Sequence, residues 1–285
     1  METPLRFPDK VTPKTRVDRI GPNPCKQQGI SMKYLSVEEA RNRSGLRLVL
    51  TRGVPGPWSE AAKAIFQLRN VDYVAVEQKG GGRNPELIEW TRHRNAPIAL
   101  YENEAPRVRW LELLDLAERL GSGPSLVPGA RSDRMFMVGL INEICGDTGL
   151  AWNARLLMLN AGYMAIGPEA AVKNPMYAEY QFEADAAESI KDKIESFLAY
   201  LADHIKAQKD KGSDHLVGNQ LTAADVYWAY FSNMLEALPP EQNPMPEGLR
   251  KSWGVLAASI SGYDPILIQQ RDRTFANYLS LPLEF

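Results

Sequence analysis

Residues 216–231 read LVGNQLTAADVYWAYF, and this stretch decides the fold of the chain. Thr222 and Asp225 stand three residues apart, directly before an apolar run. Such a pair predicts a capping box, in which the N-cap hydroxyl and the N3 carboxylate each satisfy a backbone amide of the other residue. Apolar side chains follow at helical spacing, so we expect a helix that begins here and is buried early in its length. Many surface helices start with a similar pair, so an ordinary well-capped helix is the alternative.

Length and composition bound the class of protein. The 285 residues are 44% hydrophobic and carry a net charge of −2, which suits one large or two modest domains. This charge balance gives no reason to expect nucleic acid or a membrane surface as a partner. No apolar run approaches the roughly 18 residues that a membrane span needs. Two cysteines and no cluster with metal-ligand spacing predict no metal site and a reducing, cytoplasmic setting.

The N-terminal part divides into an arm and a mixed α/β domain. Residues 1–31 contain five prolines and show no helical or strand period, and we assign residues 1–45 to an irregular arm. In residues 46–121, segments with the apolar spacing of a strand alternate with segments that have the spacing of a helix. The elements expected there are strands at 47–51, 71–77, 97–101 and 105–109, and helices at 58–66, 85–94 and 111–120. This βαβ–ββα order is the layout of a thioredoxin-like domain, with a parallel first unit and an antiparallel hairpin.

The C-terminal part is expected to be wholly helical. Residues 122–133 are rich in turn formers and are assigned to a linker, and residues 134–285 to an all-helical domain. Helices are expected over 131–145, 152–163, 189–206, from 222 onward, 247–260 and 265–279. The fold class is therefore α/β followed by all-α. His204 and His215 lie among charged residues, and we expect both at the surface.

Taken together, the mixed domain, the linker and the helical domain with its Leu-Thr-Ala-Ala-Asp box resemble the cytosolic glutathione transferase superfamily. Residues 95–98, Asn-Ala-Pro-Ile, are similar to the family's x-Val-Pro-x-Leu motif at the start of the third strand. The resemblance implies a cis peptide bond before Pro97 and pairing of the Ala96 backbone with the cysteinyl part of glutathione. A routine proline at the start of a strand is the alternative. Arg94 could receive the glycine carboxylate of the tripeptide or lie on the solvated face of a short helix.

The sequence departs from the family where a nucleophile-activating residue is expected. The family places Tyr, Ser or Cys there, and alignment with its Cys-Pro-Phe motif puts Gly56 where the cysteine would stand and Trp58 beside the ligand. Without that sulfur, mixed-disulfide chemistry is not expected. Activation of the thiol of glutathione would instead come from helix N-terminal amides and from Ser59, Thr51 or Arg52. Ser59 could equally be the N-cap of the helix.

A second departure affects the expected γ-glutamyl pocket. The family's acidic-Ser pair falls on Arg109 and Trp110. Arg109 at a helix N-terminus suits a carboxylate but cannot receive an ammonium group. Glu104 is the nearby replacement, so either glutathione binds with altered contacts or another ligand occupies this pocket.

These observations predict a glutathione-dependent transferase with glutathione as co-substrate. The resemblance implies a hydrophobic electrophile as the second substrate, held under the helical domain, and a homodimer. A non-catalytic binding or carrier protein on the same scaffold is the alternative, favoured by Gly56 and by the Arg109-Trp110 pair.

Overall fold

The computed structural model describes residues 32–171 and 173–285. The arm expected for residues 1–31 lies outside this range. The prediction of an irregular arm is wrong for residues 32–45. Leu35 pairs with Val76 in a parallel bridge, and helix α1 (Val37–Arg41) follows, capped by a box formed by Ser36 and Glu39. The Ser-x-x-Glu spacing of this box was a readable helix-start signal.

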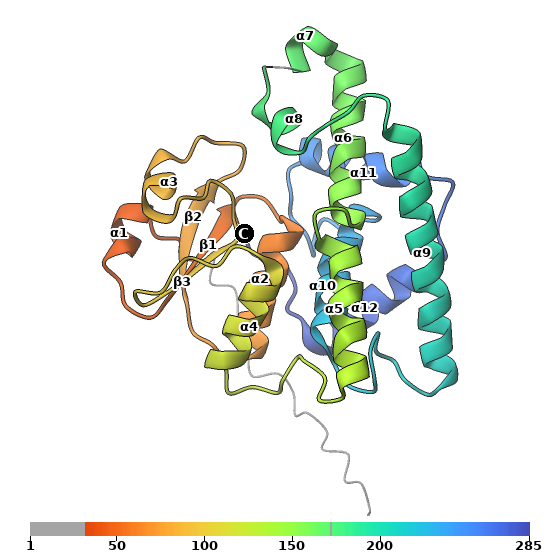
Figure 1. The fold of residues 1–285 in the computed structure, drawn as a ribbon, viewed down its shortest axis with the longest axis horizontal. Coiled ribbons are helices and arrows are strands. Elements are labelled where there is room, and N and C mark those ends of the chain that lie inside the picture. The colour runs from red at the N-terminus through yellow and green to blue at the C-terminus, as the bar shows by residue number, and fades with distance from the viewer. Residues whose placement is uncertain (1–31, 172) are drawn as a thin grey trace, which may run out of the picture. The chain divides into compact units, whose positions relative to one another are not determined.

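A three-stranded sheet in the order β2–β1–β3 forms the centre of the N-terminal part. Its strands are β1 (Leu46–Arg52), β2 (Val74–Lys79) and β3 (Ile98–Tyr101). The strand β1 runs parallel to β2 and antiparallel to β3, which confirms the thioredoxin-like arrangement. Three helices complete this part: α2 (Pro57–Leu68), α3 (Pro85–Thr91) and α4 (Trp110–Leu120) (Figure 1).

Alternating side chains of the sheet build two cores. Leu48 and Leu50 of β1 belong to the large core that includes α2 and α4. Val49 points the other way, into a smaller core with Val76 and with Leu87 of α3. This alternation is the period of two that a strand imposes on its side chains.

The predicted edge strand at 105–109 is wrong. Only one isolated bridge forms there in the described part of the chain, in which Ala99 and Arg107 exchange two hydrogen bonds of 2.9 Å. In this register the next hydrogen-bonded pair on one side would be Pro97 and Arg109, and Pro97 has no N–H group to donate, so the ladder does not continue in that direction.

The helical part follows the expected order with two additional short helices. Its helices are α5 (Arg131–Cys145), α6 (Leu150–Ile166), α7 (Pro168–Ala171), α8 (Pro175–Glu179), α9 (Ala187–Asp210), α10 (Ala223–Phe231), α11 (Glu247–Ser259) and α12 (Ile266–Tyr278), with a 3-10 turn at Ser232–Met234. The helices α7 and α8 were not expected. Within the described residues, no helix combines the length and apolar character required to cross a bilayer.

Helix α10 is the buried centre of the helical part, as its sequence predicted. All nine of its residues are buried, and it packs against α2, α5 and α12. The Asp225 carboxylate accepts the N–H groups of Leu216 (2.8 Å) and Thr222 (2.9 Å) and the Thr222 hydroxyl (3.0 Å). The predicted box therefore also ties down the loop that precedes the helix.

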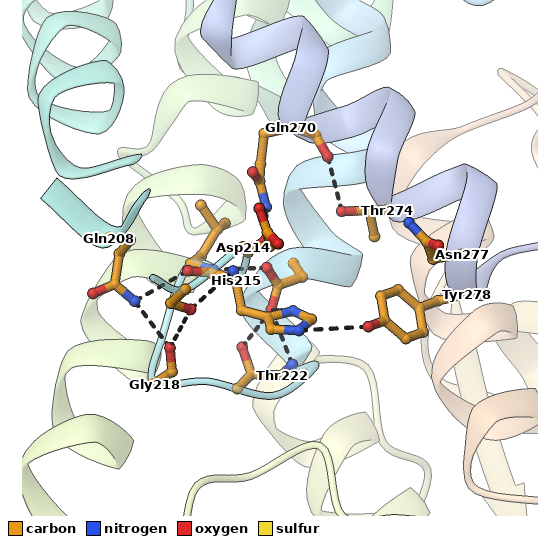
Figure 2. Close-up of polar contacts among 12 residues, drawn as sticks. Gln208, Asp214, His215, Gly218, Thr222, Gln270, Thr274, Asn277 and Tyr278 are labelled. Atoms are coloured by element: carbon orange, nitrogen blue, oxygen red, sulfur yellow. Dashed lines mark hydrogen bonds and ion pairs between the residues drawn. The ribbon is translucent and has the colours of Figure 1, made fainter. Parts of the chain in front are cut away.

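The two histidines near this loop are not simple surface residues. The ring of His215 is 13% exposed, and its Nε2 lies 3.4 Å from the Tyr278 hydroxyl (Figure 2). His204 Nε2 lies 2.6 Å from the carbonyl oxygen of Leu216. The loop before α10 contacts the His204 ring and contains His215, whose ring meets Tyr278 of α12, so the prediction of surface positions is wrong.

Candidate functional site

Three segments that carry predicted site residues meet at one end of the sheet. In the β1–β3 register Val49 pairs with Ile98, and continuing that register sets Thr51 level with Ala96. Ser59 in the first turn of α2 joins them, because its Oγ accepts the N–H of Thr51 at 3.3 Å. The end of β1, the start of α2 and the residues before β3 are thus neighbours.

The first turn of α2 presents unpaired backbone donors. Gly56 is the N-cap and has no side chain to cap the helix, and Pro57 has no N–H group. The N–H groups of Trp58 and Ser59 have no hydrogen-bond partner among the residues that the structure describes. Such donors, with the helix dipole behind them, favour an anion or a thiolate at this end of the helix. Ser59 is the third helical residue and not the cap that we considered.

The acidic residue of this turn, Glu60, accepts no hydrogen bond from those N–H groups. Glu60 is buried, and its carboxylate lies 2.7 Å from the Lys63 ammonium group. Burial raises the pKa of the Glu60 carboxyl, and the charge of Lys63 opposes that shift. The pair faces the interior of the protein, so the amides at the start of α2 stay available.

Of the candidate thiol-activating residues, Ser59 has a hydroxyl group that could donate a hydrogen bond to a ligand. The Ser59 side chain is buried, and its hydroxyl proton has no acceptor in the described residues. The Thr51 hydroxyl donates to Gln78 Oε1 at 2.9 Å. Arg52 forms an ion pair with Glu77 at 2.8 Å. The side chains of Thr51 and Arg52 are therefore engaged with β2.

The backbone before β3 matches the expectation for the family motif. The Ala96–Pro97 peptide bond is cis. Neither the N–H nor the carbonyl of Ala96 has a hydrogen bond to any residue that the structure describes. Arg94, expected at a ligand carboxylate, instead forms an ion pair with Glu179 of α8.

The residues assigned to the γ-glutamyl pocket are engaged within the protein. Glu104 accepts hydrogen bonds from Arg119 (2.6 and 2.9 Å) and from Arg107 (2.5 Å), and these hold the pKa of its carboxyl below the usual range. Arg109 is the exposed N-cap of α4, and its backbone N–H donates to Glu112 at 3.0 Å. Two arginines thus compete with any ligand ammonium group for Glu104.

Two tryptophans predicted to line the ligand site connect the two parts of the protein. Trp58 Nε1 donates to the Cys145 carbonyl at 3.2 Å. The Trp58 ring packs edge-on against the Phe231 ring, with 4.9 Å between the ring centroids. The Trp110 carbonyl accepts the Tyr227 hydroxyl at 3.3 Å, and the two rings lie 5.9 Å apart. Both indoles are packed on the helical part. Sequence spacing could not show this, because it says nothing of which face meets another domain.

Sequence reasoning missed the wall that α6 and α8 form. Tyr177 of α8 donates to the Leu159 carbonyl of α6 at 3.0 Å, and Tyr180 packs on Trp152 at 4.6 Å. Through Glu179, α8 also reaches Arg94 beside β3, and it lies on the sheet side of α6 (Figure 1). A helix of five residues gives no readable period in the sequence, so only the aromatic run at 177–182 could have indicated it.

Two surface pockets lie elsewhere, and none of the predicted site residues lines either. One is bounded by α1, β2 and α3, and the other by α5, α6 and α9. Within the described ranges, no group of three or more His, Cys, Asp or Glu side chains is arranged to hold a metal ion.

A thioredoxin-like part followed by a helical part with a buried capping box is the fold of the glutathione S-transferases. Residues 169–251 match the sequence model of the family described as "Glutathione S-transferase, C-terminal domain". The chain therefore has a glutathione-transferase-like fold, and the sequence similarity to the family lies in its residues 169–251. No curated protein sequence matches it.

Three solved structures illustrate this likeness. A glutathione S-transferase domain-containing protein from Marinobacter aquaeolei is 16% identical with a TM-score of 0.56, covering 82% of this chain and 100% of that one. A glutathione S-transferase from Methylobacterium radiotolerans, solved with glutathione sulfonate, is 18% identical (TM-score 0.52; 81% and 90% covered). A family member from Pseudomonas fluorescens, solved with two glutathione molecules, is 12% identical (TM-score 0.54; 86% and 98% covered). At these identities the likeness is one of fold.

Proposed function

We propose that the protein is a glutathione-dependent transferase that activates the thiol of glutathione at the start of α2 for attack on a hydrophobic electrophile. The observation that carries this proposal is that two backbone segments at one end of the sheet, the start of α2 and Ala96, have groups without a hydrogen-bond partner in the described residues. The N–H groups of Trp58 and Ser59 face no partner in the described chain, and the Ala96 backbone is open beside them. The relatives solved with glutathione and glutathione sulfonate support the same ligand class.

In this proposal the Ala96 backbone aligns the cysteinyl part of glutathione and the start of α2 receives its sulfur. Helix N-terminal amides stabilise a thiolate and lower its pKa. The Ser59 hydroxyl adds one further donor. The thiolate then attacks the electrophilic carbon, a C–S bond forms, the leaving group departs with the bonding electrons, and the thiol proton goes to solvent. Holding both reactants together supplies a large part of the rate.

The direct test combines binding with one substitution. The full chain should bind glutathione in isothermal titration calorimetry. Ser59→Ala should lower kcat/KM by about tenfold or more, with its pH midpoint moved upward, because the thiolate loses a donor. Thr51→Val separates the two hydroxyls, since that of Thr51 donates to Gln78, and should leave the midpoint in place. Glutathione that neither binds nor protects the protein against heat would refute the proposal.

The second candidate function is a non-catalytic carrier. It is favoured by the engagement of Arg94 with Glu179 and of Glu104 with two arginines, because both side chains would otherwise meet the tripeptide. A carrier would bind hydrophobic ligands without consuming glutathione. The homodimer implied by the resemblance is also a proposal, and light scattering at micromolar concentration that gives the monomer mass would contradict it.

A further inference from the structure

Arg155 of α6 is partly buried and has no hydrogen-bond or ion-pair partner among the residues that the structure describes. Every other arginine that the structure describes is either exposed or engaged in a hydrogen bond or ion pair. Arg155 has neither among the described residues, and its Nε is buried without a hydrogen-bond partner. A buried donor without a partner destabilises the folded protein, so this arrangement calls for a physical reason.

Aromatic rings hold the guanidinium group in place. Arg155 lies over the Tyr180 ring, with its central carbon 5.9 Å from the ring centroid. Trp152 stands one turn earlier on the same face of α6 and packs on Tyr180 at 4.6 Å. We call these three residues the Trp152–Arg155–Tyr180 surface. The planar guanidinium group carries its N–H donors in a fork, and this fork can bind a carboxylate in a bidentate manner.

The position of this surface connects it with the proposed thiol site. Tyr180 directly follows Glu179, whose carboxylate pairs with Arg94, two residues before Ala96. The short helix α8 therefore carries the surface on one side and reaches the segment before β3 on the other. An electrophile that contacts Tyr180 and Trp152 would lie on the wall of the helical part that borders the glutathione segment.

We propose that the Trp152–Arg155–Tyr180 surface binds the second substrate, and that this substrate is an aromatic carboxylate. The rings contact its aromatic body and Arg155 binds its carboxylate. This inference rests on the proposed transferase function and narrows its electrophile from hydrophobic to aromatic and anionic. In the displacement chosen to test it, the glutathione sulfur replaces chloride on a nitroaromatic ring, chloride leaves with the electron pair, and the thiol proton passes to solvent.

Two electrophiles that differ by a carboxylate test the inference. They are 4-chloro-3,5-dinitrobenzoate and the neutral 2-chloro-1,3-dinitrobenzene, which undergo the same displacement. Arg155→Gln should raise KM for the benzoate by about tenfold, which corresponds to about 1.4 kcal/mol, with KM for the neutral compound within about twofold. Arg155→Lys should fall between, because a lysine keeps the charge and loses the planar fork. Arg131→Gln, at an exposed arginine of α5, is the matched control and should change neither value.

A binding measurement separates this inference from the proposed function. 3,5-Dinitrobenzoate has no leaving group, and its binding to the full chain can be followed by calorimetry without any turnover. Loss of that binding in Arg155→Gln, with Arg131→Gln unaffected, supports the inference even if the wild type conjugates neither electrophile, an outcome that would defeat the transferase alone. Equal binding by wild type and Arg155→Gln, no binding by the wild type, or an equal rise in both KM values overturns it.

Discussion

At the scale of single residues, the carboxylate of Glu179 forms an ion pair with Arg94, which in the proposed function is a candidate partner for a carboxylate of glutathione. Glu179→Gln should tighten glutathione binding, because Arg94 would no longer be paired. The two side chains are 20% and 35% exposed, so the pair contributes about 0.2–1 kcal/mol, and its loss corresponds to a change of about 1.4- to fivefold in Kd. Calorimetry at low salt measures the effect. Glu183→Gln removes an exposed carboxylate from the same segment and is the control. Weaker binding in Glu179→Gln would show that α8 assists the ligand.

The backbone features of the candidate site could be predicted from the sequence better than its side-chain contacts. Ala96 and Gly56 could be placed because their roles are set by the backbone, and backbone geometry follows from short motifs. The side-chain partners could not be placed. Trp58 meets Phe231, 173 positions later in the chain, and Arg94 meets Glu179; such pairs depend on how two domains pack, which no local pattern encodes.

At the scale of elements, two capping boxes of the same chemistry differ in burial. In α10, Asp225 is 1% exposed and accepts three hydrogen bonds, whereas Glu39 of α1 is exposed. Asp225→Ala should lower the free energy of unfolding by about 3 kcal/mol or more, because buried N–H groups lose their acceptor. Glu39→Ala should cost at most about 1 kcal/mol, since water replaces the carboxylate. Urea unfolding measures both, and equal losses would contradict the argument.

Long periodic elements were predicted closely and short ones were missed. The α5 range was predicted to the residue, and the apolar stripe of α9 was recognised, because each extends over several turns. Helices α1, α7 and α8 span only four or five residues, too few for a helical period to register. The missed α8 is the element that joins the helical part to Arg94, so the least predictable helix lies at the candidate site.

At the scale of the whole described unit, one hydrophobic core runs through both the sheet and the helices. The same cluster contains Leu48 of β1 and Phe231 of α10, and Trp58 joins them through its contacts with Phe231 and the Cys145 carbonyl. Residues that share one core unfold together, so we expect a single urea transition in which far-UV circular dichroism and tryptophan fluorescence coincide.

Substitution of Trp58 tests this shared core. Trp58→Ala should lower the free energy of unfolding by about 3 kcal/mol, the low end for a tryptophan because the ring is half-buried. Trp58→Phe keeps a ring against Phe231 and loses the bond to the Cys145 carbonyl, so about 1 kcal/mol should be lost. Since both parts depend on the same contact, the two probes should shift together in each variant. Two separated transitions in the wild type, or a Trp58→Ala variant as stable as Trp58→Phe, would show that the sheet and the helices are stabilised independently.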